Sequence, residues 1–302
     1  MTTEDTQKYL AMMNDSTLSP DERLGALKAL ANAGLPDAPS IGEYVNNHIH
    51  TTYSFSPYTP SAAAYYAKAA GLKTAGIMDH DSVGGCEEFI KAGEILSLPV
   101  TCGCELRVSF KGTPFEGRRL NNPDQISCAY VALHGIPHGS FGEIEKVISE
   151  KRKLRNVRNG KMCSRICEIA ECVGIEIDFD RDVLPLSQYQ NGGSVTERHV
   201  LFALVKKLGQ RYESREEILS AVEKMSDSKL SDKKRNALIE APDGFFEYDL
   251  LGVLKSGLIA EIYVDAEDEL IHVTDFIGLA KKDRCHQRLR LPRRRCRVSD
   301  RR

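Results

Sequence analysis

The stretch Val45-Asn46-Asn47-His48-Ile49-His50-Thr51-Thr52-Tyr53-Ser54 decides how this sequence is interpreted. Two histidines, His48 and His50, are separated here by one residue and followed by polar residues. Because alternate side chains of an extended strand lie on one face, both imidazoles would project in the same direction from a strand end. Two imidazoles placed in this way can bind one metal ion, although a half-exposed polar strand end explains the same pair.

Further potential ligands follow the next three apolar runs. Asp79 and His80 follow residues 74–78, Glu105 follows the run that begins at Val100, and His134 follows the run that begins at Cys128. Alternation of strand and helix patterns from Tyr44 onward predicts a parallel sheet. The carboxyl ends of such strands carry the chemistry in β/α barrels, so we expect these residues to form one site.

The segments HIHTTYSFSPYTP, GIMDHDSVGG, GCEL and AYVALHG resemble, in order and spacing, the first motifs of the PHP (polymerase and histidinol phosphatase) family. The resemblance runs from about residue 44 to 280. It is greatest to the small-phosphoesterase branch, which has a helical insertion before a later histidine, here His199. The resemblance implies an α/β fold, a distorted parallel β/α barrel of the TIM-like, seven-stranded PHP type. It also implies two or three divalent metals and phosphoester hydrolysis.

The resemblance assigns roles to individual residues. His48 and His50 would hold one metal, Glu105 would bridge, and His134 with His199 would hold the second. His80 would serve a third metal, and Asp79 would orient a ligand histidine. The candidate catalytic residues are therefore Glu105, Asp79 and His80, and the candidate metal ligands are His48, His50, His80, Glu105, His134 and His199. Imidazole and carboxylate suit zinc, manganese or iron.

Two departures from the family pattern modify this expectation. The acid usual in the first motif falls on Phe55, so we expect two bound metals and not three. The Asp-x-His strand that ends the family pattern does not follow residue 280. Residues 281–302 instead carry 11 Lys and Arg and two Asp, against a net charge of −2 for the whole chain. We predict a barrel incomplete at its C-terminal end, with an exposed edge and a disordered or non-native tail produced by a shifted reading frame or truncation. The alternative is a genuine basic arm that binds nucleic acid.

The chain divides into three predicted parts. Residues 1–40 form a helical preface, residues 41–280 form the barrel with a helical insertion at about 141–194, and residues 281–302 form the tail. Residues 257–264 are predicted to be a late barrel strand.

Basic residues of the insertion are candidates for substrate binding. Arg158, Lys161 and Arg165 lie at spacings of three and four, hence on one side of a helix. With Arg198, they are the candidate phosphate-binding residues, although a solvated helix face explains the basic stretch equally well.

Composition bounds the protein class without choosing a function. The 302 residues, with 41% hydrophobic and 28% charged residues, suit one large or two small soluble domains. No apolar run is long enough to cross a membrane, and the polar N-terminus predicts a cytoplasmic protein. Nine cysteines without C-x-x-C spacing indicate reduced core thiols.

Taken together, the sequence predicts metal-dependent hydrolysis of a phosphoester in a small phosphorylated molecule or nucleotide, through a metal-activated water. The alternative is a non-catalytic PHP-like domain that binds a ligand or partner. An amidohydrolase is a weaker third interpretation, because the final-strand Asp and the usual carbamylated Lys are missing. The sequence does not determine the oligomeric state.

Overall fold

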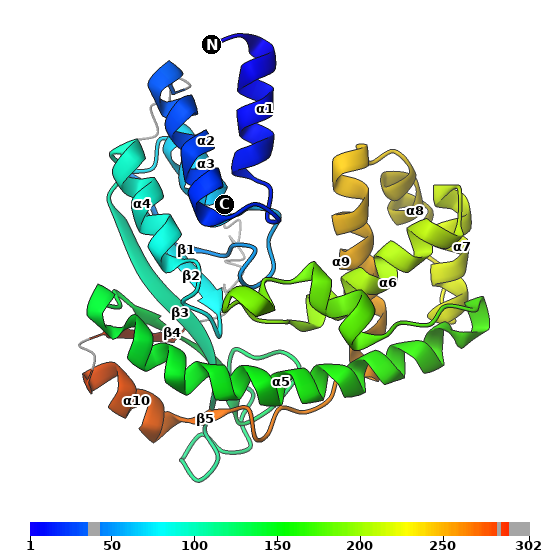
Figure 1. The fold of residues 1–302 in the computed structure, drawn as a ribbon. Coiled ribbons are helices and arrows are strands. Elements are labelled where there is room, and N and C mark those ends of the chain that lie inside the picture. Colours follow the sequence, from blue (N-terminus) through cyan, green and yellow to red (C-terminus); the bar gives the residue numbers. More distant parts are fainter. Residues whose placement is uncertain (36–42, 283–284, 290–302) are drawn as a thin grey trace, which may run out of the picture.

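A mixed β-sheet organises the computed structural model, which describes residues 1–35, 43–282 and 285–289 (Figure 1). The path through the sheet is β1-β2-β3-β4-β6, with β5 paired to β3. Strands β1, β2, β3 and β5 pair in parallel, and β4 is antiparallel to both β3 and β6. The strand bounds are Val45–Ile49, Thr74–His80, Val100–Ser109, Cys128–His134, Ile271–His272 and His286–Leu289 for β1 to β6. The predicted α/β class is confirmed.

The expectation that β4 runs parallel to its neighbours is wrong. A parallel connection needs a crossover, usually a helix, and residues 110–127 between β3 and β4 contain none. The strands therefore form an antiparallel pair in which Gly103 lies opposite His134 and Glu105 lies opposite Ala132. A Cβ at Gly103 would lie 2.4 Å from the carbonyl oxygen of Leu133, so only glycine permits this approach. His134 still emerges two positions from Glu105, on the same face.

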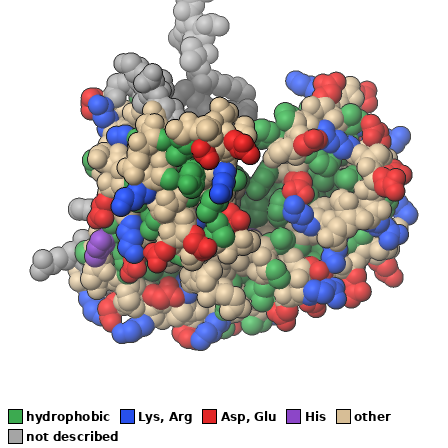
Figure 2. All heavy atoms as spheres, turned by 45° about the horizontal axis from the view of Figure 1, so that its top comes forward, with side chains coloured by type: hydrophobic (Ala, Val, Ile, Leu, Met, Phe, Trp, Pro, Cys, Tyr) green, Lys and Arg blue, Asp and Glu red, His purple; other side chains and the backbone are tan. Residues whose placement is uncertain are grey.

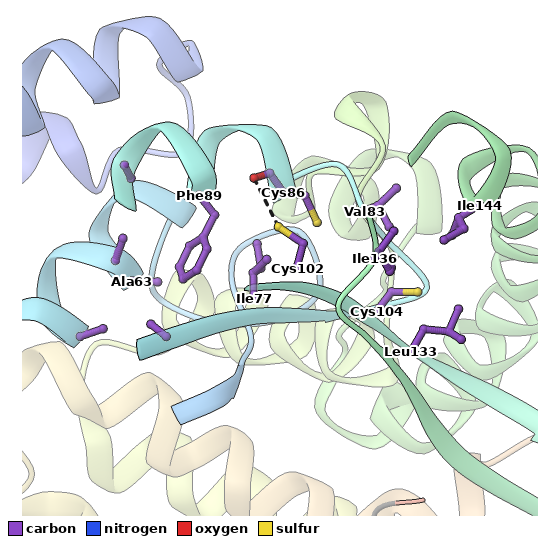
Figure 3. Packing of buried hydrophobic residues seen from close by; sticks show 14 of the residues in the cluster. Ala63, Ile77, Val83, Cys86, Phe89, Cys102, Cys104, Leu133, Ile136 and Ile144 are labelled. Atoms are coloured by element: carbon purple, nitrogen blue, oxygen red, sulfur yellow. Dashed lines mark hydrogen bonds between the residues drawn. The ribbon is translucent and has the colours of Figure 1, made fainter. Parts of the chain in front are cut away.

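Two helices connect the parallel strands and pack on one face of the sheet. Helix α3 (Pro60–Ala69) joins β1 to β2, and α4 (Cys86–Leu96) joins β2 to β3. Figure 3 shows Phe89 of α4 directed toward Ile77, and Cys104 beside Leu133. This buried layer fixes the strand ends that carry the candidate ligands.

The predicted helical preface consists of α1 (Thr3–Met13) and α2 (Pro20–Ala33). Ser19 caps α2 and exchanges hydrogen bonds with Glu22. The two helices pack against α3 and α4. A buried ion pair of 2.5 Å between Arg23 and Glu88 joins α2 to α4.

A long helix, α5 (Phe141–Ala170), leads from the sheet to a separate cluster of helices, on the right of Figure 1. We call α6 to α9 together with the second half of α5 the helical lobe, because their apolar side chains form a second core. The bounds are Glu197–Arg211 for α6, Arg215–Met225 for α7, Asp232–Ile239 for α8 and Asp243–Ile262 for α9. Short turns of 3-10 or π type are η1 to η5, at His138–Ser140, Glu171–Val173, Phe179–Val183, Leu184–Leu186 and Tyr189–Asn191.

The helical region predicted at about 141–194 thus continues to Ile262. The strand predicted at 257–264 is wrong, because most of this segment forms the end of α9. The buried residues of α9 recur every four positions, which is a helical period, at Leu250, Leu254, Leu258 and Ile262.

The basic C-terminal segment is ordered where the structure describes it. Helix α10 (Val273–Lys282) includes Lys281 and Lys282, and residues 286–289 form β6 along β4. The prediction of a disordered tail is therefore wrong for the described residues 286–289, which pair along the edge of β4. Residues 290–302, which hold most of the arginines, lie outside the described ranges.

Two expectations about composition can be compared with the described part of the chain. Its eight cysteines form no disulfide, and five of them are buried, in agreement with the prediction of core thiols. None of the helices in these ranges combines the length and apolar character needed to cross a membrane.

Candidate metal centre

Glu105 of β3 lies at the centre of three imidazoles. Its Oε2 atom is 3.4 Å from Nε2 of His48, 3.7 Å from Nε2 of His50 and 3.4 Å from Nδ1 of His80. The geometry follows from the sheet, because His80 at the end of β2 pairs in register with Glu105 and β1 is the next strand. His48, His50 and Glu105 each offer one donor atom, and these three atoms lie within 4.8 Å of one another. The sequence motifs on three different strands therefore converge on one point.

The donor atoms at this point fit a divalent cation. Glu105 is only 1% exposed, yet neither of its oxygens, nor Nε2 of His48, makes a hydrogen bond with the described residues. Burying such groups without a partner is costly, and a bound cation would satisfy all of them. Burial raises the pKa of Glu105, but His48, His80 and His50 outweigh it and lower that pKa to about 2. Burial lowers the pKa of His80 to about 3. The carboxylate is therefore ionised and His80 is neutral, as metal ligands must be.

Asp79 stabilises the loop that carries His50. Its Oδ1 accepts hydrogen bonds from the Thr51 backbone N–H at 2.7 Å and from Ser54 Oγ at 2.6 Å, and its Oδ2 accepts one from Thr51 Oγ1 at 2.6 Å. Ser54 Oγ also lies 3.4 Å from Nδ1 of His50. Burial raises the pKa of Asp79, while His50 and these hydrogen bonds oppose the increase. Asp79 thus acts on His50 through Ser54.

His134 lies at the border of this cluster. Its ring centroid is 6.3 Å from that of His48, which places it beside the three-residue set but not among the donor atoms that lie closest together. His50 and His80 stack with ring centroids 4.6 Å apart. The structure therefore brings four of the predicted histidines to one region.

His199 occupies a different environment from the predicted one. It lies in the first turn of α6, where its Nδ1 accepts a hydrogen bond of 3.0 Å from the backbone N–H of Thr196. A neutral imidazole that accepts at Nδ1 carries its proton on Nε2, so it has no lone pair left for a metal. Burial, together with Arg155, lowers the pKa of His199 to about 3. This hydrogen bond argues against the predicted role of His199 as a ligand and assigns it to the cap of α6.

Phe55, which stands where the family has an acid, packs against His199 with ring centroids 4.9 Å apart. It thus occupies an aromatic environment next to the loop that carries His50.

The predicted phosphate-binding residues have other surroundings. Arg158 is buried in an ion pair of 3.0 Å with Glu269, and Arg165 donates to the carbonyl oxygen of Tyr263. Lys161 and Arg198 are exposed. Within the described residues, no hydrogen bond or ion pair joins these four side chains to the cluster around Glu105.

The side chains of α5 that reach the cluster are Arg152 and Arg155. Arg155 forms an ion pair with Asp81, the residue after His80, and Arg152 donates to the carbonyl oxygen of Asp81 at 3.0 Å. Asp81 has a left-handed backbone, with φ of 48°, which these contacts hold in place.

A signal for these residues was present in the sequence. The apolar positions Ile144, Ile148, Met162 and Ile166 repeat at helical spacing and mark the inward face of α5. Extending the spacing of three and four between them selects residues 152, 155 and 159, all of which are buried. Lys161 and Arg165 lie outside this inward face and are exposed.

The chain resembles known proteins in sequence and in fold. A family model described as the PHP domain matches residues 46–278. The fold resembles that of an amidohydrolase from Chromobacterium violaceum with a TM-score of 0.52, at 18% identity over 82% of this chain and 69% of that one. It also resembles a proposed metal-dependent phosphoesterase from Bifidobacterium adolescentis with a TM-score of 0.45, at 18% identity over 82% of this chain and 98% of that one. No curated protein matches the sequence. Because the family model covers most of the chain and its motifs meet around Glu105, the protein belongs to the PHP domain family.

Proposed function

We propose that this protein is a metal-dependent hydrolase that cleaves a phosphoester of a small phosphorylated molecule. The observation that carries the proposal is the buried Glu105 carboxylate, which faces three imidazoles and makes no hydrogen bond within the described part of the chain. When bound there, divalent ions such as zinc, manganese or iron lower the pKa of a water ligand and stabilise charge on phosphoryl oxygens.

The protein's own residues supply orientation. Thr51 and Ser54 both donate hydrogen bonds to Asp79, which holds the start of the loop after β1 rigidly. Ser54 Oγ lies 3.4 Å from Nδ1 of His50, and Nε2 on the other side of the ring faces Glu105 at 3.7 Å. We assign Asp79 to this positioning role, and Glu105, His48 and His50 to the metal, with His80 and His134 beside them.

Arg155 anchors α5 beside the candidate centre. The residue is 2% exposed, pairs with Asp81 and lies 3.6 Å from Glu197, so two carboxylates balance its charge. Arg155 therefore holds Asp81, the residue after His80, in place.

The test is phosphate release from a panel of phosphomonoesters with added Mn²⁺. Removal of a residue that supports a ligand costs about 10–100-fold in affinity or activity, so Glu105→Gln, which removes a ligand itself, should cost about 100-fold or more. Glu94→Gln on α4, an exposed acid, is the matched control and should retain activity. Metal binding by the wild type without phosphate release from any ester would refute the proposal and support the alternative, a non-catalytic ligand-binding domain.

A further inference from the structure

Tyr130 of β4 lies beside the candidate metal centre. It stands directly opposite Arg107 in the pair of β3 and β4, two positions from Ala132, which lies opposite Glu105. Because residues two positions apart in a strand lie on one face, Tyr130 and Glu105 share a face of the sheet. The centroid of the Tyr130 ring lies 5.5 Å from that of the His80 ring. Since His80 ends β2 and β3 lies between β2 and β4, the two rings meet over β3, next to Glu105.

The hydroxyl group of Tyr130 has no partner in the described part of the chain. The hydroxyl of a buried tyrosine usually finds one, as that of Tyr263 does by donating to Oε1 of Gln125 at 3.2 Å. No hydrogen bond or ion pair joins the hydroxyl of Tyr130 to another described residue, although its ring is partly buried. A phenol can both donate and accept a hydrogen bond, so this group is available to a bound molecule.

The backbone of Tyr130 is held in place by the side chain of Asn121. Nδ2 of Asn121 donates to the carbonyl oxygen of Tyr130, and Oδ1 of Asn121 accepts from the N–H of Tyr130, both at 2.8 Å. On its other side Tyr130 pairs with β3. A donor on a backbone fixed from both sides loses little freedom when it binds a ligand, so less of the interaction is lost to ordering.

Charged groups from three other elements act on the Tyr130 hydroxyl. Burial and the Glu197 carboxylate of α6 raise the pKa of Tyr130, while the guanidinium groups of Arg107 on β3 and Arg155 on α5 oppose this increase. The phenol is therefore neutral at pH 7 and keeps the proton that it can donate. A neutral O–H group fixed beside a metal centre is suited to stabilise negative charge on a phosphoryl oxygen.

A small molecule can reach this region from the surface. The side chains of His48, His50 and His80 are 26%, 25% and 25% exposed. The loop after β1, which carries His50, lines a cavity of about 170 Å³ together with residues of α6 and α9. Figure 2 shows a hollow between the sheet side of the molecule and the helical lobe. A ligand at the candidate centre would thus lie next to Tyr130 without any rearrangement of the sheet.

We infer that Tyr130 is a substrate-binding residue, whose hydroxyl donates a hydrogen bond to a phosphoryl oxygen of a group held at the metal centre. Its role in ester cleavage rests on the proposed function, whereas its role in binding a phosphate group does not. Tyr130 keeps its proton throughout, and it binds the phosphate group and not the metal.

The direct test measures binding of inorganic phosphate to the Mn²⁺-loaded protein by equilibrium dialysis, with no ester and no turnover. Loss of one hydrogen bond to a charged group should weaken phosphate binding about tenfold or more, and we expect this effect from Tyr130→Phe. The same variant should keep the wild-type affinity for Mn²⁺. Tyr65→Phe is the matched control, because Tyr65 is a buried tyrosine of α3 whose ring contacts Tyr66. Absence of phosphate binding to the wild type, equal binding by wild type and Tyr130→Phe, or a parallel loss of Mn²⁺ affinity would overturn the inference.

A second measurement separates this inference from the proposed function. With Mn²⁺ present, Tyr130→Phe should lower kcat/KM about tenfold or more for each phosphomonoester that the wild type cleaves. Cleavage with the same kcat/KM in both proteins would remove the role of Tyr130 and retain the hydrolase. Phosphate binding that depends on Tyr130, without cleavage of any ester, would retain the phosphate site and remove the hydrolase.

Discussion

Glu105 Oε2 lies 3.4 Å from Nε2 of His48, and neither atom makes a hydrogen bond with any residue in the described ranges. A buried carboxylate facing an unpaired imidazole nitrogen is unfavourable in an isolated protein. A divalent cation bound between these groups would therefore stabilise the folded chain.

Metal binding should stabilise the fold. A ligand at 100 times its Kd that binds only the folded chain adds about 2.7 kcal/mol to the free energy of unfolding. We expect this gain from Zn²⁺ or Mn²⁺, and we expect His48→Gln to abolish most of it, as measured by urea denaturation with and without metal. His138→Gln, which changes an exposed histidine, is the control. Elemental analysis should find at most two tightly bound ions per chain, and three would contradict the role given to Phe55.

Asp79→Asn should reduce both stability and activity. Asn has one acceptor oxygen, and its amide group would face the hydroxyl or N–H donors of Thr51 and Ser54. Leaving a buried donor without its acceptor costs about 1–3 kcal/mol. Chemical denaturation measures the loss, and Asp275→Asn, on the exposed face of α10, should have little effect. If Asp79→Asn lost activity with full metal affinity and full stability, Asp79 would take part in the chemistry directly.

Arg155→Met should destabilise the protein by about 3–5 kcal/mol, because it leaves the Asp81 carboxylate uncompensated at a buried position. Lys161→Met, at an exposed position of the same helix, should cost about 0.5 kcal/mol or less. The double variant Asp81→Asn, Arg155→Met should recover part of the loss, which a double-mutant cycle measures. Equal effects of Arg155→Met and Lys161→Met would show that α5 is not anchored through Arg155.

Stability should fall as the pH is lowered below about 6.5, in part because of His199. Its pKa is about 3 in the folded protein and about 6.5 in an unfolded chain. Between these values the unfolded chain binds the extra proton and the folded chain does not, so acid favours unfolding. His199→Gln retains an acceptor for the Thr196 N–H and cannot be protonated. We therefore expect the free energy of unfolding of this variant to fall by about 1 kcal/mol less than that of the wild type between pH 7 and pH 5.5. EDTA is present in both measurements. An identical loss in the two proteins would mean that the pKa of His199 is the same in the folded and the unfolded chain.

Gly103→Ala should be strongly destabilising, since the new Cβ would lie 2.4 Å from both the Leu133 carbonyl oxygen and the Met78 side chain. The resulting shift of β3 against β4 would also displace Glu105, two residues along β3, so metal affinity should fall as well. Gly278→Ala is the control, because a Cβ there meets nothing within 4 Å and Ala favours a helix by about 0.5–1 kcal/mol. Thermal denaturation separates the two variants, and a stable Gly103→Ala protein would show that β4 can move freely.

The sequence by itself determined which short segments carry ligands. His48 and His50 share a strand face because of the two-residue period of a strand, and His80 and Glu105 follow apolar runs that form neighbouring parallel strands. The capped preface helices were also predictable, since Ser19 and Glu22 satisfy each other within one turn. These features depend on contacts between residues close together in the chain, or on a regular repeat.

Only the tertiary structure decided the direction of β4, the helical state of residues 257–262 and the pairing of β6, because each depends on what the segment packs against. It likewise decided what the inward-facing arginines of α5 pair with. The apolar spacing of the helix places Arg152 and Arg155 on the buried face, but only the fold supplies a partner such as Asp81 that makes their burial favourable. The role of His199 also depends on the tertiary structure, because its hydrogen bond to Thr196 fixes which ring nitrogen carries the proton. The sequence therefore specified the donors of the candidate centre, while the fold decided which of them have a lone pair to offer and which cations lie beside them.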